Sequence, residues 1–285
     1  MNPQRRRRYI TIGIAVLLVA LPCVWLARQY RQVKLNRALI AAANRCNADM
    51  VDRLLAQGAN PNTRDTPQQR QTISWQLHHL LYKMPDPSQT AIMCVLISGS
   101  AYEKIKPPGS VLRIVKALID RGANVNAPMV NGYSALMCSS SVRDIGVVKA
   151  LIAAHADVNA KDISGSTALS WAAYNGNTEA VKLLAVAGAD MTGYLPLVKA
   201  IQTCHTDTFK ALIAAHADVN ARDSMGRSML IYAVANRNTD AVIALTQAHA
   251  DVNARDGAGK TAISYATAHY QVDVAALLRK AGARE

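Results

Sequence analysis

A short sequence pattern recurs seven times along this 285-residue chain. Each copy centres on an aliphatic residue, here termed the anchor of its unit, and the anchors are Leu39, Ile92, Leu136, Leu169, Leu197, Leu230 and Ile263. Successive anchors lie 53, 44, 33, 28, 33 and 33 residues apart. A recurring period of 20–50 residues is typical of solenoids, in which each unit contacts its neighbours and the stack builds one core. The spacing therefore predicts a row of units instead of one globular core.

The pattern inside each unit predicts two helices. Small pairs such as Ala42-Ala43 and Ala172-Ala173 let one helix lie close to its neighbour. Segments such as Val181-Lys-Leu-Leu184 give the other helix one apolar stripe. A composition of 51% hydrophobic but only 5% aromatic residues suits such an array of Ala, Leu and Val helices. Because one helix pair cannot bury both faces, the units must stack.

The clearest unit shows which family the pattern resembles. It reads Asp162-Ile-Ser-Gly-Ser-Thr-Ala-Leu-Ser-Trp-Ala-Ala173, followed by Gly176, Val181-Lys-Leu-Leu184 and Gly188-Ala-Asp190. This order and spacing resemble the ankyrin repeat. The resemblance implies an all-α solenoid of about seven helix pairs with projecting β-turn fingers over residues 35–285. It also implies that the chain binds another protein and is not an enzyme.

A stretch without charged residues, from Tyr9 to Ala27, precedes the repeats. Its 19 residues, at about 1.5 Å each, reach roughly the 30 Å of a bilayer core. We therefore predict a transmembrane helix over 9–27, between a basic tail (1–8) and a basic juxtamembrane linker (28–34). A cleaved signal peptide is the alternative, but Trp25-Leu26-Ala27 lacks a small residue at the outer cleavage position. The sequence favours an uncleaved signal anchor.

Basic residues are concentrated near this segment. The first 37 residues hold eight Lys and Arg and no acid, which leaves 24 basic and 19 acidic residues, a surplus of five, in the rest. A nucleic-acid-binding protein would carry its surplus in the folded domain, so we predict no nucleic-acid partner. Counting charges leaves the orientation open. Because moving Arg5–Arg8 across a membrane is costly, we expect a single-pass inner-membrane protein with a cytoplasmic N-terminus and periplasmic repeats. Export of a soluble chain after cleavage is the alternative.

Departures from the 33-residue period point to candidate binding regions. Two insertions belong to the second unit, near residues 65–89 and 98–110. The first carries Trp75, His78 and Tyr82 on a predicted short amphipathic helix, and the second carries Tyr102. Inserted segments of repeat proteins often lie on a binding face, although a packing role is the alternative. The spacing from Leu169 to Leu197 is five residues short, which predicts a missing finger and a notch for a partner.

The residue two positions after each anchor should lie on the inner, concave side of the solenoid. In the second half of the chain these residues are Trp171, Lys199, Tyr232 and Tyr265. Trp and Tyr are favoured binding residues because they bury much area with few rotamers, but packing against the next repeat is the alternative. Lys161, Arg222 and Arg255 form a basic row at the finger bases, which serves either as a docking stripe or as a solvated edge. The complete set of candidate partner-binding residues is Trp75, His78, Tyr82, Tyr102, Trp171, Tyr174, Lys199, Arg222, Tyr232, Arg255 and Tyr265.

Cysteines and histidines indicate structural roles. Cys94 and Cys138 occupy equivalent positions of adjacent units, which places them roughly 8–10 Å apart, whereas a disulfide needs Cα atoms within about 7 Å. Residues His155, His216 and His249 each replace a glycine that ends the outer helix. We expect them to adopt the left-handed backbone of that position. Stacking keeps the three imidazoles apart, so we predict no metal site.

No catalytic motif is present. The segment Gly257-Ala-Gly-Lys-Thr261 ends like a phosphate-binding loop, but Ala254 stands where the first glycine is required. We predict no cofactor and no enzymatic activity. The sequence suggests a membrane-anchored protein-interaction module. One hypothesis is an immunity protein, whose partner is a secreted, envelope-targeting toxin. The alternative is a periplasmic scaffold or stress-protection factor, whose partner is an envelope enzyme. The sequence does not predict the oligomeric state.

Overall fold

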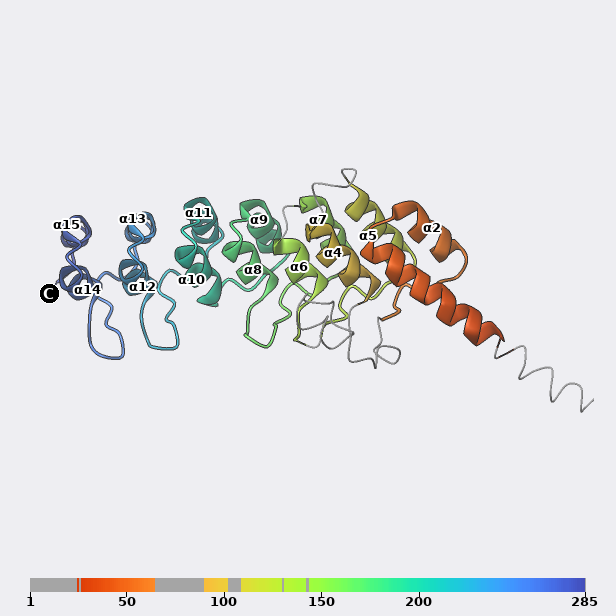
Figure 1. The fold of residues 1–285 in the computed structure, drawn as a ribbon. Helices are drawn as coiled ribbons and strands as arrows, with labels where there is room; N and C mark the ends of the chain where they lie inside the picture. The colour runs from red at the N-terminus through yellow and green to blue at the C-terminus, as the bar shows by residue number, and fades with distance from the viewer. Residues whose placement is uncertain are drawn as a thin grey trace, which may run out of the picture. The chain divides into compact units, whose positions relative to one another are not determined.

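The computed structural model describes residues 25, 27–64, 90–101, 109–129, 131–141 and 144–284. The chain divides into two compact units, one of residues 1–99 with 104–124 and one of residues 100–103 with 125–285. Both units are built from pairs of helices, and the described residues contain no strand beyond isolated β-bridges (Figure 1). The all-helical architecture predicted from the repeat pattern is confirmed.

The first unit begins with a helix over residues 27–44 and continues with α2 (Ala48–Ala56), α4 (Ala91–Ala101) and α5 (Ser110–Asp120). The stretch 28–34, predicted as a basic linker, is helical and continuous with the first repeat. From it, Gln32 Nε2 donates a hydrogen bond of 2.9 Å to the carbonyl of Gly58 after α2. No helix among the described residues combines the length and apolar character needed to cross a bilayer, and the predicted segment 9–27 lies almost wholly outside them.

The second unit contains five helix pairs among its described residues. They are α6 (Ala135–Ser141) with α7 (Ile145–Ala153), α8 (Ala168–Tyr174) with α9 (Thr178–Val186), α10 (Leu195–Gln202) with α11 (Thr206–Ala214), α12 (Met229–Ala235) with α13 (Thr239–Gln247), and α14 (Ala262–Ala268) with α15 (Val272–Lys280). The first helix of each pair packs on the first helix of the next pair, and the second on the second. Two helical layers result, with the short helices on the inner layer.

The core follows the repeat pattern. All seven anchor residues are at most 1% exposed, and Ala172, Ala173 and Ala43 are fully buried. Each anchor contributes a buried aliphatic side chain to the core, while the alanines allow close approach of the inner helices. Fully burying one Leu or Ile side chain contributes about 1.5–3 kcal/mol, so each anchor stabilises the array appreciably.

Polar side chains mark where the helices begin. Thr167, Ser228 and Thr261 cap inner helices by accepting a backbone hydrogen bond from the third residue of the helix. Asn177 and Asn238 cap outer helices in the same way, and their amides also donate to Ser140 and Ile201 carbonyls one repeat earlier, at 3.2 and 3.0 Å. These caps therefore set helix boundaries and join neighbouring repeats.

The outer helices end in a left-handed residue. The φ angles of His155, His216 and His249 are 60°, 64° and 59°, and Gly188 has 85° at the same position. The predicted left-handed conformation of the three histidines is confirmed. A side chain with a Cβ atom adopts this region at a cost of roughly 1–2 kcal/mol per residue. The histidines therefore carry local backbone strain that glycine would relieve.

Asparagine side chains then join successive outer-helix ends. The amide of Asn159 donates to the Gly188 carbonyl at 3.2 Å, and its oxygen accepts from the Asp190 backbone at 2.8 Å. Asn126 and Asn253 make the same pair of bonds in other repeats. Thr192 stands at this position in the fifth repeat, and its hydroxyl donates to Asp190 at 2.6 Å instead. The fifth repeat thus lacks the asparagine link to the sixth.

Connector lengths show where a finger is absent. The connectors 154–167, 215–228 and 248–261 have fourteen residues each, whereas 187–194, between α9 and α10, has eight. Figure 1 shows the three long connectors projecting as loops before α8, α12 and α14, and no such projection before α10. The gap predicted from the short spacing between Leu169 and Leu197 is confirmed.

The insertions of the second repeat are described only in part. An antiparallel bridge between Arg64 and Thr90 closes the base of the first insertion. The second insertion begins by lengthening α4, which runs to Ala101 and has 11 residues where α6 and α8 have seven. The candidate residues Trp75, His78, Tyr82 and Tyr102 lie outside the described residues, so their partner-binding role stays a prediction.

Candidate protein-binding surface

Each finger is a tight turn closed by a backbone hydrogen bond. Four fingers are described in the second unit, at residues 129 and 131–134, 162–167, 223–228 and 256–261, and they are called the third, fourth, sixth and seventh fingers after their repeats. Asp162 N donates to the Ser166 carbonyl at 3.0 Å, and the sixth and seventh fingers close in the same way. Asp162 Oδ1 also accepts from the backbone of Ser164 at 2.8 Å and of Ser166 at 3.0 Å. The aspartate therefore holds the finger shape.

The second oxygen of this aspartate ties the finger to the inner helix. Trp171 Nε1 donates to Asp162 Oδ2 at 3.1 Å, and the Tyr265 hydroxyl donates to Asp256 Oδ2 at 2.8 Å. Burial would raise the pKa of Asp162, but its hydrogen bonds outweigh this effect and lower the pKa below the usual value. Trp171 and Tyr265 therefore have structural roles in addition to any binding role.

Tyr232 occupies the same position in the sixth repeat but has different neighbours. It is 6% exposed, its hydroxyl accepts from Gln202 Nε2 at 2.6 Å, and the Arg227 guanidinium lies 4.9 Å from its ring centre. Arg227 Nε in turn donates to Asp223 Oδ2 at 2.7 Å. Such burial leaves little of Tyr232 for a partner to contact. Its position matches the alternative of packing inside the array.

The two arginines of the predicted basic row act on the fingers. Arg222 donates from one guanidinium nitrogen to the Gly226 carbonyl at 2.8 Å and to the Arg255 carbonyl at 2.5 Å. Arg255 makes the equivalent bond to Gly259 at 2.8 Å. Both side chains are hydrogen-bonded to their own turns, and Arg222 also joins the sixth finger to the seventh. Their use in docking a partner remains a prediction.

An aromatic cluster lies beside the missing fifth finger. Tyr133 and Trp171 meet edge to face with ring centres 5.2 Å apart, and Trp171 and Tyr174 do so at 6.1 Å. Lys199 Nζ, from α10, lies 5.6 Å from the centre of the Tyr174 ring. Such edge-to-face pairs and cation–π contacts each contribute on the order of 1 kcal/mol. The cluster therefore has a defined geometry.

This cluster borders a surface hollow, which we call the notch pocket. Its volume is ≈ 270 Å³, and it is lined by Ser164, Ser166, Ser170, Trp171, Tyr174 and Lys199. The fourth finger, α8 and α10 thus supply its walls. Three residues predicted for partner binding, Trp171, Tyr174 and Lys199, are brought together here, whereas Tyr232 and Tyr265 line neither this pocket nor its aromatic cluster.

Tyr133 belongs to the cluster but was not among the predicted residues. It lies in the third finger, its hydroxyl is 3.3 Å from Ser141 Oγ, and burial raises its pKa to about 12. It therefore stays protonated at neutral pH. One feature of the sequence could have indicated its role. Tyr133 directly precedes Ser134, which caps the inner helix of the third repeat, and from there an aromatic ring can reach the inner helix of the fourth repeat.

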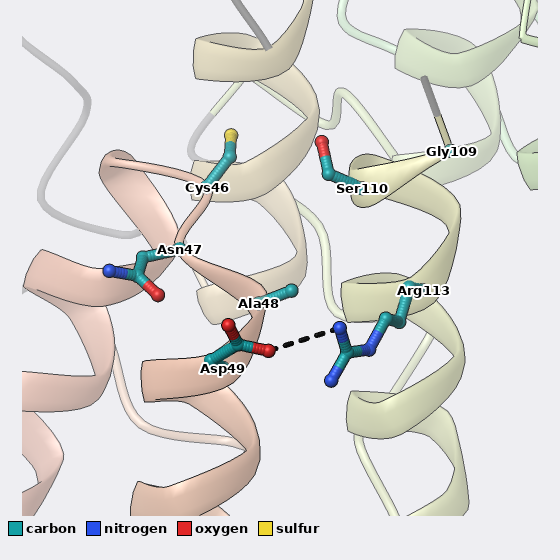
Figure 2. A pocket seen from close by; sticks show the side chains of 7 residues that line it. All are labelled: Cys46, Asn47, Ala48, Asp49, Gly109, Ser110 and Arg113. Carbon is teal, nitrogen blue, oxygen red and sulfur yellow. Dashed lines mark ion pairs between the residues drawn. The ribbon is translucent and has the colours of Figure 1, made fainter. Parts of the chain in front are cut away.

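A second hollow lies in the first unit, between the beginnings of α2 and α5. It has a volume of ≈ 370 Å³ and is lined by Cys46, Asn47, Ala48, Asp49, Gly109, Ser110 and Arg113. Figure 2 shows Asp49 and Arg113 pointing toward each other across it. Arg113 pairs with Asp49 at 3.1 Å and with Asp52 at 2.5 Å, and these exposed pairs contribute little to stability. The sequence did not indicate this pocket because Asp49 belongs to the first repeat and Arg113 to the second, and the two insertions separate them along the chain.

Cysteine and histidine positions indicate neither crosslinks nor ligands. None of Cys46, Cys94, Cys138 and Cys204 forms a disulfide, and only Cys204 of these four is exposed. Burial raises the pKa of Cys138 to about 12, which makes this thiol unreactive at neutral pH. No group of three potential metal ligands occurs in the described part of the chain.

Comparison with known proteins agrees with this architecture. A family model described as ankyrin repeats (3 copies) matches residues 39–162, 141–223 and 197–284. The human ASB11 ankyrin repeat domain, a crystal structure, has 20% sequence identity and a TM-score of 0.65, with 87% of this chain and 98% of that chain covered. At this identity the likeness shows the fold alone. No curated protein matches the sequence. Since the family model spans nearly the whole chain after residue 38, the protein belongs to the ankyrin repeat family, which typically serves as a non-enzymatic scaffold for binding other proteins.

Proposed function

We propose that the notch pocket is the main contact site of this protein-interaction module. The observation that carries the proposal is the group formed by Trp171, Tyr174 and Lys199 beside the gap left by the fifth finger. Tyr174 is 44% exposed although it belongs to an inner helix, so it can be covered by a partner without rearrangement. Trp and Tyr are among the residues that most often dominate binding energy at protein interfaces.

A capture experiment tests this proposal. The full-length chain is used as bait for crosslinking in intact envelopes, in parallel with Tyr174→Ala. The matched control is Tyr270→Ala, because Tyr270 is 91% exposed in the turn between α14 and α15. We expect the wild-type chain and the control to capture the same protein and Tyr174→Ala to lose most of it. Equal capture by all three chains would place the main contact elsewhere.

The uncharged segment 9–27 supports a second part of the proposal, that the protein is anchored in the inner membrane with its repeats in the periplasm. The exposed thiol of Cys204 gives a direct test, because the described thiols other than Cys204 are buried. A membrane-impermeant maleimide should label Cys204 in cells with a permeabilised outer membrane, and Cys204→Ser should abolish the label. Labelling only after rupture of the inner membrane would reverse the orientation. Recovery of the chain in the soluble periplasmic fraction would favour cleavage of the signal.

An immunity role is the specific function that we propose for this anchored module. The anchor, the irregular second repeat and the missing finger suit a protein shaped for one partner, such as a toxin delivered into the envelope by a secretion system. Co-expression with periplasm-directed toxins encoded nearby should rescue growth, and rescue should fail with Tyr174→Ala. A periplasmic scaffold or stress-protection factor that tethers an envelope enzyme is the alternative. Capture of such an enzyme, without rescue from any toxin, would favour it.

A further inference from the structure

Fingers of adjacent repeats pack directly against each other where both are present. Ile163 N of the fourth finger donates to the Asn131 carbonyl of the third at 3.0 Å. A Cβ atom on Gly132 would lie 3.1 Å from Asp162 Cα, so the two turns are in close contact. In the sixth and seventh fingers, a Cβ atom on Gly226 would lie 3.3 Å from Gly257 N. Each finger therefore offers one edge to the finger before it and one to the finger after it.

The missing fifth finger leaves two of these edges without a neighbour. Ser164 is equivalent to Asn131 in its turn, and among the described residues its carbonyl accepts no hydrogen bond; the equivalent carbonyl of Met225 in the sixth finger accepts none there either, although the seventh finger follows it. Ser224 of the sixth finger is equivalent to Ile163 and is exposed. Its backbone N–H donates to no acceptor among the described residues. The Leu195 side chain reaches within 3.9 Å of a Cβ placed on Gly165, so it fills part of the base of the gap. A free acceptor and a free donor thus lie on the two fingers that border a slot about one repeat, or roughly 10 Å, wide.

The floor of the slot carries a positive charge without a carboxylate partner. No ion pair of the described residues includes Lys199, whose ammonium lies over the Tyr174 ring. Asp162, on the adjacent finger, forms no ion pair with Lys199; its Oδ1 accepts from the backbone of its own turn, and its Oδ2 accepts from Trp171. The charge therefore complements an acidic group brought from outside.

The size of the notch pocket limits what that group can belong to. Its ≈ 270 Å³ lies near the lower end of the ~300–1,000 Å³ typical of small-molecule sites, and such a volume can also hold one or two side chains of a larger partner. Unpaired backbone groups on either side suit an extended or turn segment, which can add hydrogen bonds as an added strand does at a sheet edge.

We propose that the partner inserts a tight turn into the place of the fifth finger, with an Asp or Glu side chain against Lys199. This inference rests on the proposed function and adds the chemistry of the partner. The turn's backbone pairs with the Ser164 carbonyl on one side and the Ser224 N–H on the other. Its acidic side chain pairs with the Lys199 ammonium, and a neighbouring apolar side chain covers the exposed part of Tyr174.

A library of disulfide-closed turn peptides displayed on phage provides the probe. Selection uses the full-length chain in detergent, and synthetic versions of the selected peptides are measured by fluorescence anisotropy. We expect Asp or Glu to be enriched at one turn position. Lys199→Glu should weaken binding by about ten-fold or more, and added salt should also weaken it. Lys210→Glu is the matched control, because Lys210 is an exposed lysine on α11 of the same repeat, and it should change binding by less than about two-fold.

A second variant tests the slot itself. In this variant the eight-residue connector 187–194 is replaced by a copy of the fourteen-residue connector 215–228, which supplies the absent finger. It should lose peptide binding while its helical content is kept. If the grafted chain does not fold, comparison of Lys199→Glu with Lys210→Glu decides alone.

The results separate this inference from the proposed function. Selected peptides without acidic residues, binding that survives Lys199→Glu, or binding to the folded graft would overturn the inserted acidic turn. A selection with no binders would do the same, because the library contains the required turns. None of these outcomes affects the capture experiment, which fails only if Tyr174→Ala retains the partner.

Discussion

Removal of Asp223 is the sharpest test of how the fingers are held. Asp223 Oδ1 accepts from the backbone of Met225 at 2.9 Å and of Arg227 at 3.0 Å. Its Oδ2 accepts from Arg227 Nε at 2.7 Å and pairs with the second guanidinium nitrogen at 2.7 Å. The carboxylate side chain is only 6% exposed. One side chain therefore closes the turn and orients the arginine that covers Tyr232.

The expected cost follows from these contacts. A hydrogen bond to a charged group contributes about 1.5–3 kcal/mol, but water can replace the carboxylate at the exposed Met225 amide. Arg227 is 25% exposed and keeps its contact with the Tyr232 ring, which limits the penalty of leaving its charge unpaired. We therefore expect Asp223→Ala to lower the free energy of unfolding by about 3 kcal/mol, less than the sum of the bonds. Asp223→Asn keeps an oxygen acceptor and should cost roughly half as much.

Two measurements check this magnitude. Urea unfolding followed by circular dichroism gives the change in free energy if the slope is unchanged. Because a solenoid can unfold unit by unit, amide hydrogen exchange at Met225 and Arg227 shows whether the loss is local to the sixth finger. Asp207→Ala is the control, since Asp207 is exposed in the first turn of α11, and it should change stability by at most about 0.5 kcal/mol. Equal losses for the two alanine variants would refute the role given to Asp223.

Acid provides an independent check. Burial would raise the pKa of Asp223, but the hydrogen bonds from Arg227 and Met225 outweigh it and lower the pKa in the folded state. A group whose pKa is lowered by folding stabilises the fold fully above its unfolded value, about 3.9 for Asp, and loses this contribution as the pH falls through the folded value. The stability difference between wild type and Asp223→Ala should thus be constant near neutral pH and shrink below about pH 4. A stability difference between the two chains that grows on acidification would contradict this prediction.

Three further changes test the repeat architecture. Replacing His216, which has a φ of 64°, by glycine should raise stability by about 1 kcal/mol in urea unfolding, and a loss would mean that the ring makes a compensating contact. Among the described residues of the wild-type chain, Asp218 N donates only to the Met191 carbonyl, at 3.4 Å, and Thr192→Asn should restore the missing asparagine link. This variant should raise the free energy of unfolding by about 0.5–1.5 kcal/mol and slow hydrogen exchange of the Asp218 amide. Unchanged exchange would count against the link. Leu197→Ala, at a fully buried anchor, should cost about 2–5 kcal/mol by the same unfolding assay, whereas a cost below 1 kcal/mol would indicate that the site is not core.

Much of the fold was predictable because each repeat imposes the same local requirements. Anchors such as Leu136 and Leu230 could be identified since only buried aliphatic residues recur at that spacing. The left-handed histidines followed from the glycine at the same place in other repeats. The missing finger followed from residue counting alone. In each case a position could be compared with its equivalents inside the same chain.

The site was only partly predictable because its contacts depend on side-chain geometry. The position two residues after the anchor was predicted to face inward, but Trp171 and Tyr265 also donate a hydrogen bond to an aspartate nine residues earlier, in the finger. Tyr232 likewise lies nine residues after Asp223, but there Arg227 donates the hydrogen bond to the aspartate. The spacing was visible in the sequence. Which group donates to the carboxylate depends on whether an arginine lies near enough to compete.

We expect the absence of one finger to affect binding more than stability because of how a solenoid is built. Each repeat contacts only its neighbours, so the loss of a surface turn removes contacts to two fingers while leaving Leu197 and the inner-helix core fully buried. What the loss exposes is concentrated in one place: the unpaired edges of two turns, the Tyr174 ring and the Lys199 charge. A binding surface can therefore arise by deletion, without any new side chain. On this reasoning the residues that define the site belong to the repeats on either side of the gap and keep their structural roles, as Trp171 does.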